Sequence, residues 1–235
     1  MNEKNYLTQV PPKSFFEHCA FLCVDLQGGP HVDEHARNYV KEMPAQWREM
    51  GFSLADVNAA VDYYVDHCIP SAITATKACR AYGLPMIFIH WGSHFEDGID
   101  IDPFSREELI TRHEDGSVTC SCGLSVGDRP ASYLDVQPGE YVLHKTSQDT
   151  FAGTPILFML QNLNIQNLVL IGGHTGACLG RTSKSAKENG FRTLCVEDAT
   201  NNAFESNRIA KMLECNYDYI ITAQQLKECL AQSRE

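Results

Sequence analysis

The chain has 235 residues, of which 43% are hydrophobic and 21% charged, so it can bury one core without help from a metal or disulfides. Its formal net charge of −11 argues against nucleic acid or an anionic membrane as partner, because both require clustered lysine and arginine. The first ten residues are polar, and no run approaches the roughly 18 apolar residues that a membrane span needs. We therefore expect a cytoplasmic protein, one domain over residues 1–235, and a small-molecule partner.

Short apolar runs rich in β-branched or aromatic residues predict six strands. They span residues 20–24, 85–90, 140–143, 167–171, 192–196 and 217–222. Helical patterns lie between these runs, which favours a mostly parallel sheet covered on both faces. The predicted class is α/β, a three-layer α/β/α arrangement with a doubly wound sheet of about six strands.

Helix boundaries are indicated by capping residues. The longest helical pattern covers residues 54–82, where Ser53 followed by Asp56 resembles a capping box and Gly83 is a stop signal. A second helix is expected after Pro155, and a third over residues 177–189.

Two segments interrupt this alternation. Residues 91–138 are rich in Gly, Pro, Asp, Ser and His with little periodicity, which is typical of a lid, a binding loop or an interface segment. Residues 30–52 are expected to form a lid or an interface. The ten cysteines lie mostly in apolar runs and are interpreted as buried, reduced thiols with room for one reactive exception.

Three polar residues follow separate predicted strands, and ligands of open α/β sheets bind at the carboxyl ends of strands. They are Asp25, Lys145 and Cys178. Cys178 follows a glycine-rich loop at a predicted helix start, where the helix dipole favours thiolate and free N–H groups can stabilise an oxyanion. Asp25 would act as general base and acid, and Lys145 as a fixed positive charge. From spacing alone, the three could equally be a core thiol, a turn residue and a surface lysine.

Taken together, the three motifs resemble the isochorismatase-like cysteine hydrolase superfamily, which includes nicotinamidases, N-carbamoylsarcosine and ureidoacrylate amidohydrolases, and biuret-type hydrolases. The segments 21–27, 145–154 and 172–178 resemble its motifs for the catalytic Asp, Lys and Cys in that order. The resemblance implies an Asp25, Lys145 and Cys178 triad and a cis peptide before His174. It also implies an oxyanion hole formed by the backbone N–H groups of His174 and Cys178.

The resemblance also implies a homo-oligomer, a dimer or tetramer, and we expect no cofactor. Six side chains near the motifs are candidate substrate-binding residues: Gln27, His90, His94, Phe151, Thr175 and Arg181. Two departures from the family pattern stand out. Residues 28–30, Gly-Gly-Pro, stand where the family has an acidic residue and Phe. His174 stands where the family has a small apolar residue, and we expect its side chain to contact either the substrate or a neighbouring polar group.

Other candidate ligand residues have competing interpretations. Nicotinamidases carry a metal after the second strand, but residues 90–97 lack the Asp-Trp-His pattern, so we predict no metal here and expect His90 and His94 to line the pocket or bond within the loop. Cys120 and Cys122 near His113 are a weak metal signal and are interpreted as loop cysteines near an interface.

Arg112 and Arg181 are the cations considered for a substrate carboxylate, with surface or interface roles as the alternative. The predicted function is hydrolysis of the C–N bond in a small amide or N-carbamoyl (ureido) compound through a thioester, releasing ammonia or an amine. The first alternative is a metal-assisted, nicotinamidase-type amidase. The second is a non-catalytic interaction protein on the same fold.

Overall fold

The computed structural model describes residues 9–28, 53–124, 130–202 and 205–234. The segment 30–52, for which the sequence suggests a lid or interface, lies outside these ranges, as do Gly29 and Pro30. Among the described residues, no helix has the length and apolar character needed to cross a membrane.

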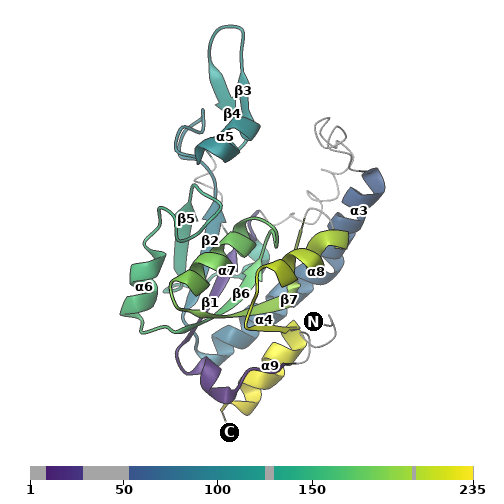
Figure 1. Ribbon diagram of the computed structural model, residues 1–235, viewed down its shortest axis with the longest axis vertical. Coiled ribbons are helices and arrows are strands. Elements are labelled where there is room, and N and C mark those ends of the chain that lie inside the picture. Colours follow the sequence, from purple (N-terminus) through teal and green to yellow (C-terminus); the bar gives the residue numbers. More distant parts are fainter. Residues whose placement is uncertain (1–8, 29–52, 125–129, 203–204, 235) are drawn as a thin grey trace.

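All six predicted strands are present and form one sheet (Figure 1). They are β1 (Cys19–Val24), β2 (Met86–Trp91), β5 (Tyr141–Lys145), β6 (Asn167–Gly172), β7 (Arg192–Thr200) and β8 (Tyr219–Ile221). Their order is β5-β2-β1-β6-β7-β8, and every neighbouring pair is parallel. The chain therefore starts in the middle of the sheet, builds one half outward to β5, and returns beside β1 to build the other half. This reversal between β1 and β6 is the topological switch point at which open α/β sheets bind ligands.

Helices cover both faces of the sheet, as the alternating pattern predicts (Figure 1). In chain order they are α3 (Leu54–Tyr63), the π-helical turn η3 (Tyr64–Cys68), α4 (Ile69–Tyr82), α6 (Ile156–Asn162), α7 (Cys178–Glu188), α8 (Glu205–Glu214) and α9 (Ala223–Gln232). Short 3-10 turns precede β1 and β5, namely η2 (Lys13–Phe16) and η5 (Ser132–Leu134). The predicted capping box of Ser53 and Asp56 is confirmed, and Gly83 ends α4 in the left-handed conformation.

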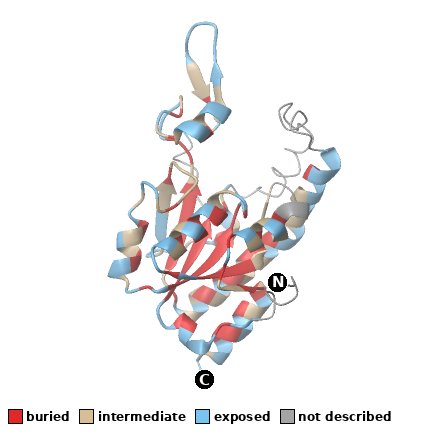
Figure 2. Cartoon of the chain, viewed as in Figure 1, coloured by how far each residue is buried: buried red, intermediate tan, exposed pale blue. Residues whose placement is uncertain are grey.

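Strand β1 shows why the sheet strands are continuous apolar runs. Phe21 and Cys23 face the helix layer of α4 and α9, whereas Leu22 and Val24 face the layer of α6 and α7. Every residue of the strand is buried, because successive side chains enter opposite cores. Figure 2 shows the inner strands of the sheet as the buried centre of the molecule, whereas the edge strand β5 is partly exposed.

The interval 91–138 contains structure that its sequence pattern does not predict. It includes α5 (Pro103–Leu109) and an antiparallel hairpin of β3 (Ile110–Arg112) and β4 (Val118–Cys120). These elements project from the carboxyl end of the sheet, and most of the hairpin is exposed (Figures 1 and 2). We refer to residues 91–124 as the arm.

Gly172 at the end of β6 lets two strand ends approach closely. It has a φ of +117°, and an added Cβ would overlap the carbonyl oxygen of Val24 at the end of β1. The following residue, Gly173, donates its N–H to that oxygen at 2.9 Å. A side chain at position 172 would therefore force apart the two strands between which the site lies.

We predict that Gly172→Ala lowers the free energy of unfolding by about 3 kcal/mol or more, because backbone overlap adds to left-handed strain. Gly190→Ala is the matched control, since Gly190 has a φ of +87° but open space around its Cα. It should cost about 1 kcal/mol. Urea unfolding of both variants checks this, and equal losses would contradict the argument.

Candidate active site

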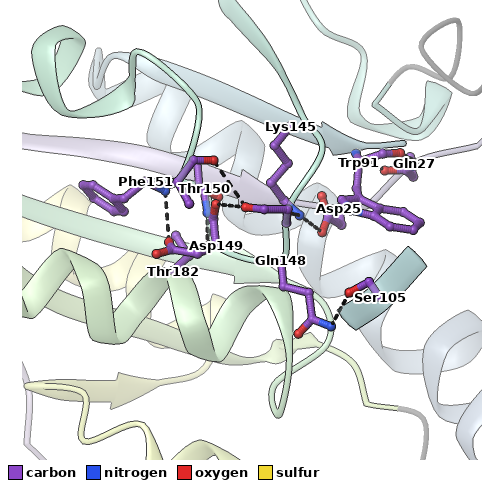
Figure 3. A network of polar contacts seen from close by, with 12 residues as sticks. Asp25, Gln27, Trp91, Ser105, Lys145, Gln148, Asp149, Thr150, Phe151 and Thr182 are labelled. Carbon is purple, nitrogen blue, oxygen red and sulfur yellow. Dashed lines mark hydrogen bonds and ion pairs between the residues drawn. The ribbon is translucent and has the colours of Figure 1, made fainter. Parts of the chain in front are cut away.

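The structure brings Asp25, Lys145 and Cys178 together at the carboxyl edge of the sheet. Asp25 follows β1, Lys145 ends β5, and Cys178 is the first residue of α7. The Lys145 Nζ lies 2.8 Å from Oδ2 of Asp25 (Figure 3). The thiol of Cys178 lies close enough to Asp25 and Lys145 that both charges act on it. Three residues from three separate segments of the chain thus form one contact group.

Lys145 reaches Asp25 across the end of β2, because β2 lies between β5 and β1. Its side chain is fully buried, and Nζ also donates a hydrogen bond to the Ser147 carbonyl oxygen at 2.9 Å. A buried ammonium is costly unless it is paired in this way. Since a buried ion pair adds little net stability on its own, its placement beside a thiol points to a chemical role.

Asp25 is held in the left-handed backbone conformation, with a φ of 55°. Its N–H donates to the carbonyl oxygen of Ile89 on β2 at 2.9 Å, which fixes the turn at the strand end. Aspartate tolerates this conformation better than most residues. The turn directs the carboxylate toward Lys145 at the base of the site (Figure 3).

Burial and mutual charge control the protonation of the group. Burial raises the pKa of the Asp25 carboxyl, and the ammonium of Lys145 opposes that increase. Burial, followed by the negative charge of Asp25, raises the pKa of the Cys178 thiol to about 12, although Lys145 acts in the opposite direction. The thiol is therefore protonated near neutral pH. The helix start and Lys145 favour the thiolate, but burial and the carboxylate act in the opposite direction and outweigh them.

The loop between β6 and α7 is fixed against the end of β7. Asn201 donates its N–H to the Gly172 carbonyl oxygen at 3.1 Å, and Thr175 donates its N–H to the Asn201 carbonyl oxygen at 2.9 Å. The peptide bond between Gly173 and His174 is cis, as the family resemblance implies. The N–H of Cys178 lies in the first turn of α7, where backbone donors have no partner within the helix. An oxyanion hole formed by His174 and Cys178 stays a prediction.

A cavity of about 500 Å³ opens above this group. The cavity is lined by the end of β2, the start of α7, α5 and the loops that follow the strands. Trp91 comes from β2, Cys178 from α7, and Ser105, Glu108 and Leu109 from α5. The loops contribute Asp25, Gln27, Gln148, Gly173, His174, Ala177 and Asn201. The cavity has the volume of a small-molecule site, with the thiol and carboxylate in its wall.

Gln27, a predicted substrate-binding residue, lines this cavity, and so does His174, for which the sequence left a substrate contact or a polar neighbour open. Desolvation by the surrounding protein lowers the pKa of His174, and the charge of Asp25 opposes that decrease. The Gln27 side chain accepts a hydrogen bond from the Trp91 N–H at 2.7 Å and donates one to the Trp91 carbonyl oxygen at 3.0 Å. Gln27 thus joins the ends of β1 and β2 and fixes the backbone of Trp91 at the cavity wall (Figure 3).

The other five substrate-binding candidates are not among the residues that line the cavity. His90 is buried with its ring 5.0 Å from that of His144, and His94 pairs with Asp100 through Nδ1 at 2.8 Å. Their role in substrate binding stays a prediction.

The same holds for the remaining three candidates. The Phe151 ring lies 6.1 Å from that of Phe191, Thr175 is buried, and Arg181 is exposed on α7. None of them forms part of the cavity wall within the described residues.

Sequence reasoning missed the α5 wall, although a signal was present. Asp102 caps α5 by accepting a hydrogen bond from the Ser105 N–H at 3.0 Å, and Pro103 occupies its first turn. An Asp-Pro pair of this kind marks a helix start. The resulting helix places Ser105, Glu108 and Leu109 on one face, at spacings of three and four residues.

Among the described residues, no three His, Cys, Asp or Glu side chains converge in a way that could hold a metal ion. Cys120 and Cys122 contact each other, with their sulfur atoms 3.2 Å apart, at the base of the arm.

The raised pKa of Cys178 predicts how fast its thiol is modified at different pH values. Because thiolate is the reactive form, modification by methyl methanethiosulfonate should accelerate roughly tenfold per pH unit from pH 7 to 10. Peptide mass spectrometry of time points would locate the modified cysteine, with Cys178→Ser as the background control. A modification rate that stops increasing below pH 8 would show that the thiol is already ionised there and would contradict its raised pKa.

Comparisons with known proteins agree with the fold and with the family that the sequence resembles. A family model described as the isochorismatase domain matches residues 62–225. Maleamate amidohydrolase from Pseudomonas putida is 29% identical over 92 residues, which are 37% of this chain and 42% of that protein. The chain thus matches less than half the length of this curated relative.

Two solved structures extend the comparison to nearly the whole chain. An isochorismatase family protein from Burkholderia thailandensis is 22% identical with a TM-score of 0.62, covering 91% of this chain and 96% of that one. N-carbamoylsarcosine amidase from Thermoplasma acidophilum is 22% identical with a TM-score of 0.54, covering 87% and 95%. At this identity the likeness concerns the fold.

Proposed function

The chain belongs to the isochorismatase family, and on that premise we propose that it is a cysteine-dependent amidohydrolase. It cleaves the C–N bond of a small amide or N-carbamoyl (ureido) compound. The observation that carries the proposal is the group of Asp25, Lys145 and Cys178, in which Asp25 and Cys178 line a small-molecule cavity and Lys145 is buried behind them, paired with Asp25. The curated relative is named for amide hydrolysis, which supports the same reaction class.

The first half of the reaction forms a thioester. Asp25 accepts the thiol proton while the sulfur of Cys178 attacks the carbonyl carbon, so that proton transfer and attack are coupled. This coupling is required because the free thiol is protonated near neutral pH. The N–H groups of His174 and Cys178 stabilise the oxyanion, and the Lys145 ammonium offsets the negative charge in the site. The C–N bond then breaks, and Asp25 gives its proton to the departing nitrogen.

The second half returns the enzyme to its initial state. Asp25, again a carboxylate, accepts a proton from water, and the resulting hydroxide attacks the thioester carbon. The C–S bond breaks, the acid is released, and the thiolate recovers the proton from Asp25. One amide and one water give one acid and one ammonia or amine. A carboxylate with a raised pKa suits both proton acceptance and proton return.

We predict that ammonia release from a panel of ureido compounds and carboxamides, including nicotinamide, depends on all three side chains. Cys178→Ser, Asp25→Asn and Lys145→Met should each lower kcat by at least about a thousandfold, because they act as one unit. Cys122→Ser is the matched control, since Cys122 is another partly exposed thiol outside the cavity.

The outcomes of this panel separate the alternatives. Ureido turnover that survives chelation supports the proposal, whereas nicotinamide turnover lost on chelation supports the metal-assisted, nicotinamidase-type amidase. Activity that persists in Cys178→Ser contradicts the assignment of Cys178 as the nucleophile. The absence of turnover for every compound favours the non-catalytic interaction role.

We also propose that the enzyme is a cytoplasmic homo-oligomer. All ten cysteines are free, which is typical of reducing compartments. The arm exposes four large apolar side chains, at 52% for Phe95, 61% for Ile99, 69% for Phe104 and 62% for Leu124. Large exposed apolar side chains of this kind are found at association surfaces.

Phe104→Asp should shift the protein toward monomer in sedimentation velocity, because a charge on the arm would oppose burial of its apolar surface. Phe158→Asp is the matched control, since Phe158 on α6 is also 69% exposed but lies outside the arm. A monomeric wild type, or equal effects of both variants, would contradict the proposed interface.

A further inference from the structure

Helix α5 forms the cavity wall that lies opposite the sheet edge. Its residues Ser105, Glu108 and Leu109 line the cavity together, as expected for one helix face. The helix is tied to the loop that follows Lys145, because Gln148 Nε2 donates a hydrogen bond to Ser105 Oγ at 3.2 Å (Figure 3). The wall that carries Glu108 is therefore fixed to the segment that also positions the catalytic lysine.

The charged groups that face the cavity are acidic. Of the described residues that line it, Asp25 and Glu108 are the ones with formal charge, and His174 is neutral near pH 7. The ammonium of Lys145 is fully buried and already paired with Asp25. A substrate carboxylate in this cavity would meet Glu108 without an opposing lysine or arginine from the described wall.

The two arginines that the sequence suggested for a substrate carboxylate lie elsewhere. Arg112 pairs with Glu107 at 2.8 Å, and its side chain is 62% exposed. Arg181 is exposed on α7, and neither arginine belongs to the cavity wall. Glu107 and Glu108 are adjacent on α5, yet Glu107 has an arginine partner on the surface whereas Glu108 faces the cavity.

We propose that the substrate carries a cationic group, such as a primary ammonium, remote from the scissile carbonyl, and that Glu108 binds this group. The inference rests on the proposed amidohydrolase function and specifies its substrate class. Glu108 is an exposed residue of the cavity wall, and a carboxylate there can form a charge-assisted hydrogen bond with an ammonium group. Trp91 and Leu109 in the same wall supply aromatic and apolar surface, and an aromatic face also attracts cations.

Three amides of similar size and different charge test the inference: β-alaninamide, butanamide and succinamate. In the wild type, kcat/KM should be highest for the cation and lowest for the anion. Glu108→Gln should lower kcat/KM for β-alaninamide roughly tenfold or more and leave that for butanamide within about twofold, since one charge-assisted contact is lost. Glu107→Gln removes the same charge from the neighbouring position and should leave the charge preference unchanged.

Binding to Cys178→Ser separates this inference from the proposed function, because it needs no turnover. Calorimetry with the same three amides should give the lowest Kd for β-alaninamide, and the preference should disappear in the Cys178→Ser, Glu108→Gln double variant. A Kd for the cation no lower than that for the neutral amide, including no measurable binding, overturns the inference. A similar decrease in kcat/KM for β-alaninamide in Glu107→Gln and in Glu108→Gln also overturns the inference. Turnover of no amide by the wild type, with the binding preference present, would overturn the proposed reaction and leave the Glu108 site standing.

Discussion

The buried contact between Lys145 and Asp25 is the constraint on which the site depends. The ammonium and carboxylate lie 2.8 Å apart beneath the cavity, and each is costly to bury without the other. To form the contact, β5 must lie one strand away from β1, with β2 between them. The doubly wound order supplies this spacing and at the same time brings the loop after β6 beside Asp25. The strand order of the sheet therefore sets the positions of all three site residues.

The charge balance of this group shapes the proposed mechanism. Asp25 raises the pKa of the thiol that it is proposed to deprotonate, and Lys145 opposes this effect at both residues. The resting site thus holds a protonated thiol beside a carboxylate with a raised pKa. Deprotonation coupled to attack avoids a free thiolate before substrate binds. Proton return to the departing nitrogen uses the same raised pKa in the opposite direction.

Substrate selection is proposed to depend on a different part of the structure, helix α5. The strand ends carry the reacting groups, whereas α5 closes the cavity from the arm, and its one cavity-facing charge is Glu108. A rigid sheet edge with a variable outer wall allows one reaction to serve substrates of different charge. The exposed apolar side chains of the same arm place the proposed oligomer contacts close to the substrate wall.

The sequence by itself determined the six strands, the caps of α3 and α4, and the three motif residues. Strands buried on both faces are continuous apolar runs, and polar residues directly after such runs must lie at the ligand-binding edge. Only the tertiary structure decided that Glu108 faces the cavity while Glu107 pairs with Arg112. It also decided that Cys178 is a protonated thiol, because burial and a carboxylate from another strand outweigh the helix start. Both outcomes depend on groups distant in the chain, whose contacts and desolvation no local pattern contains.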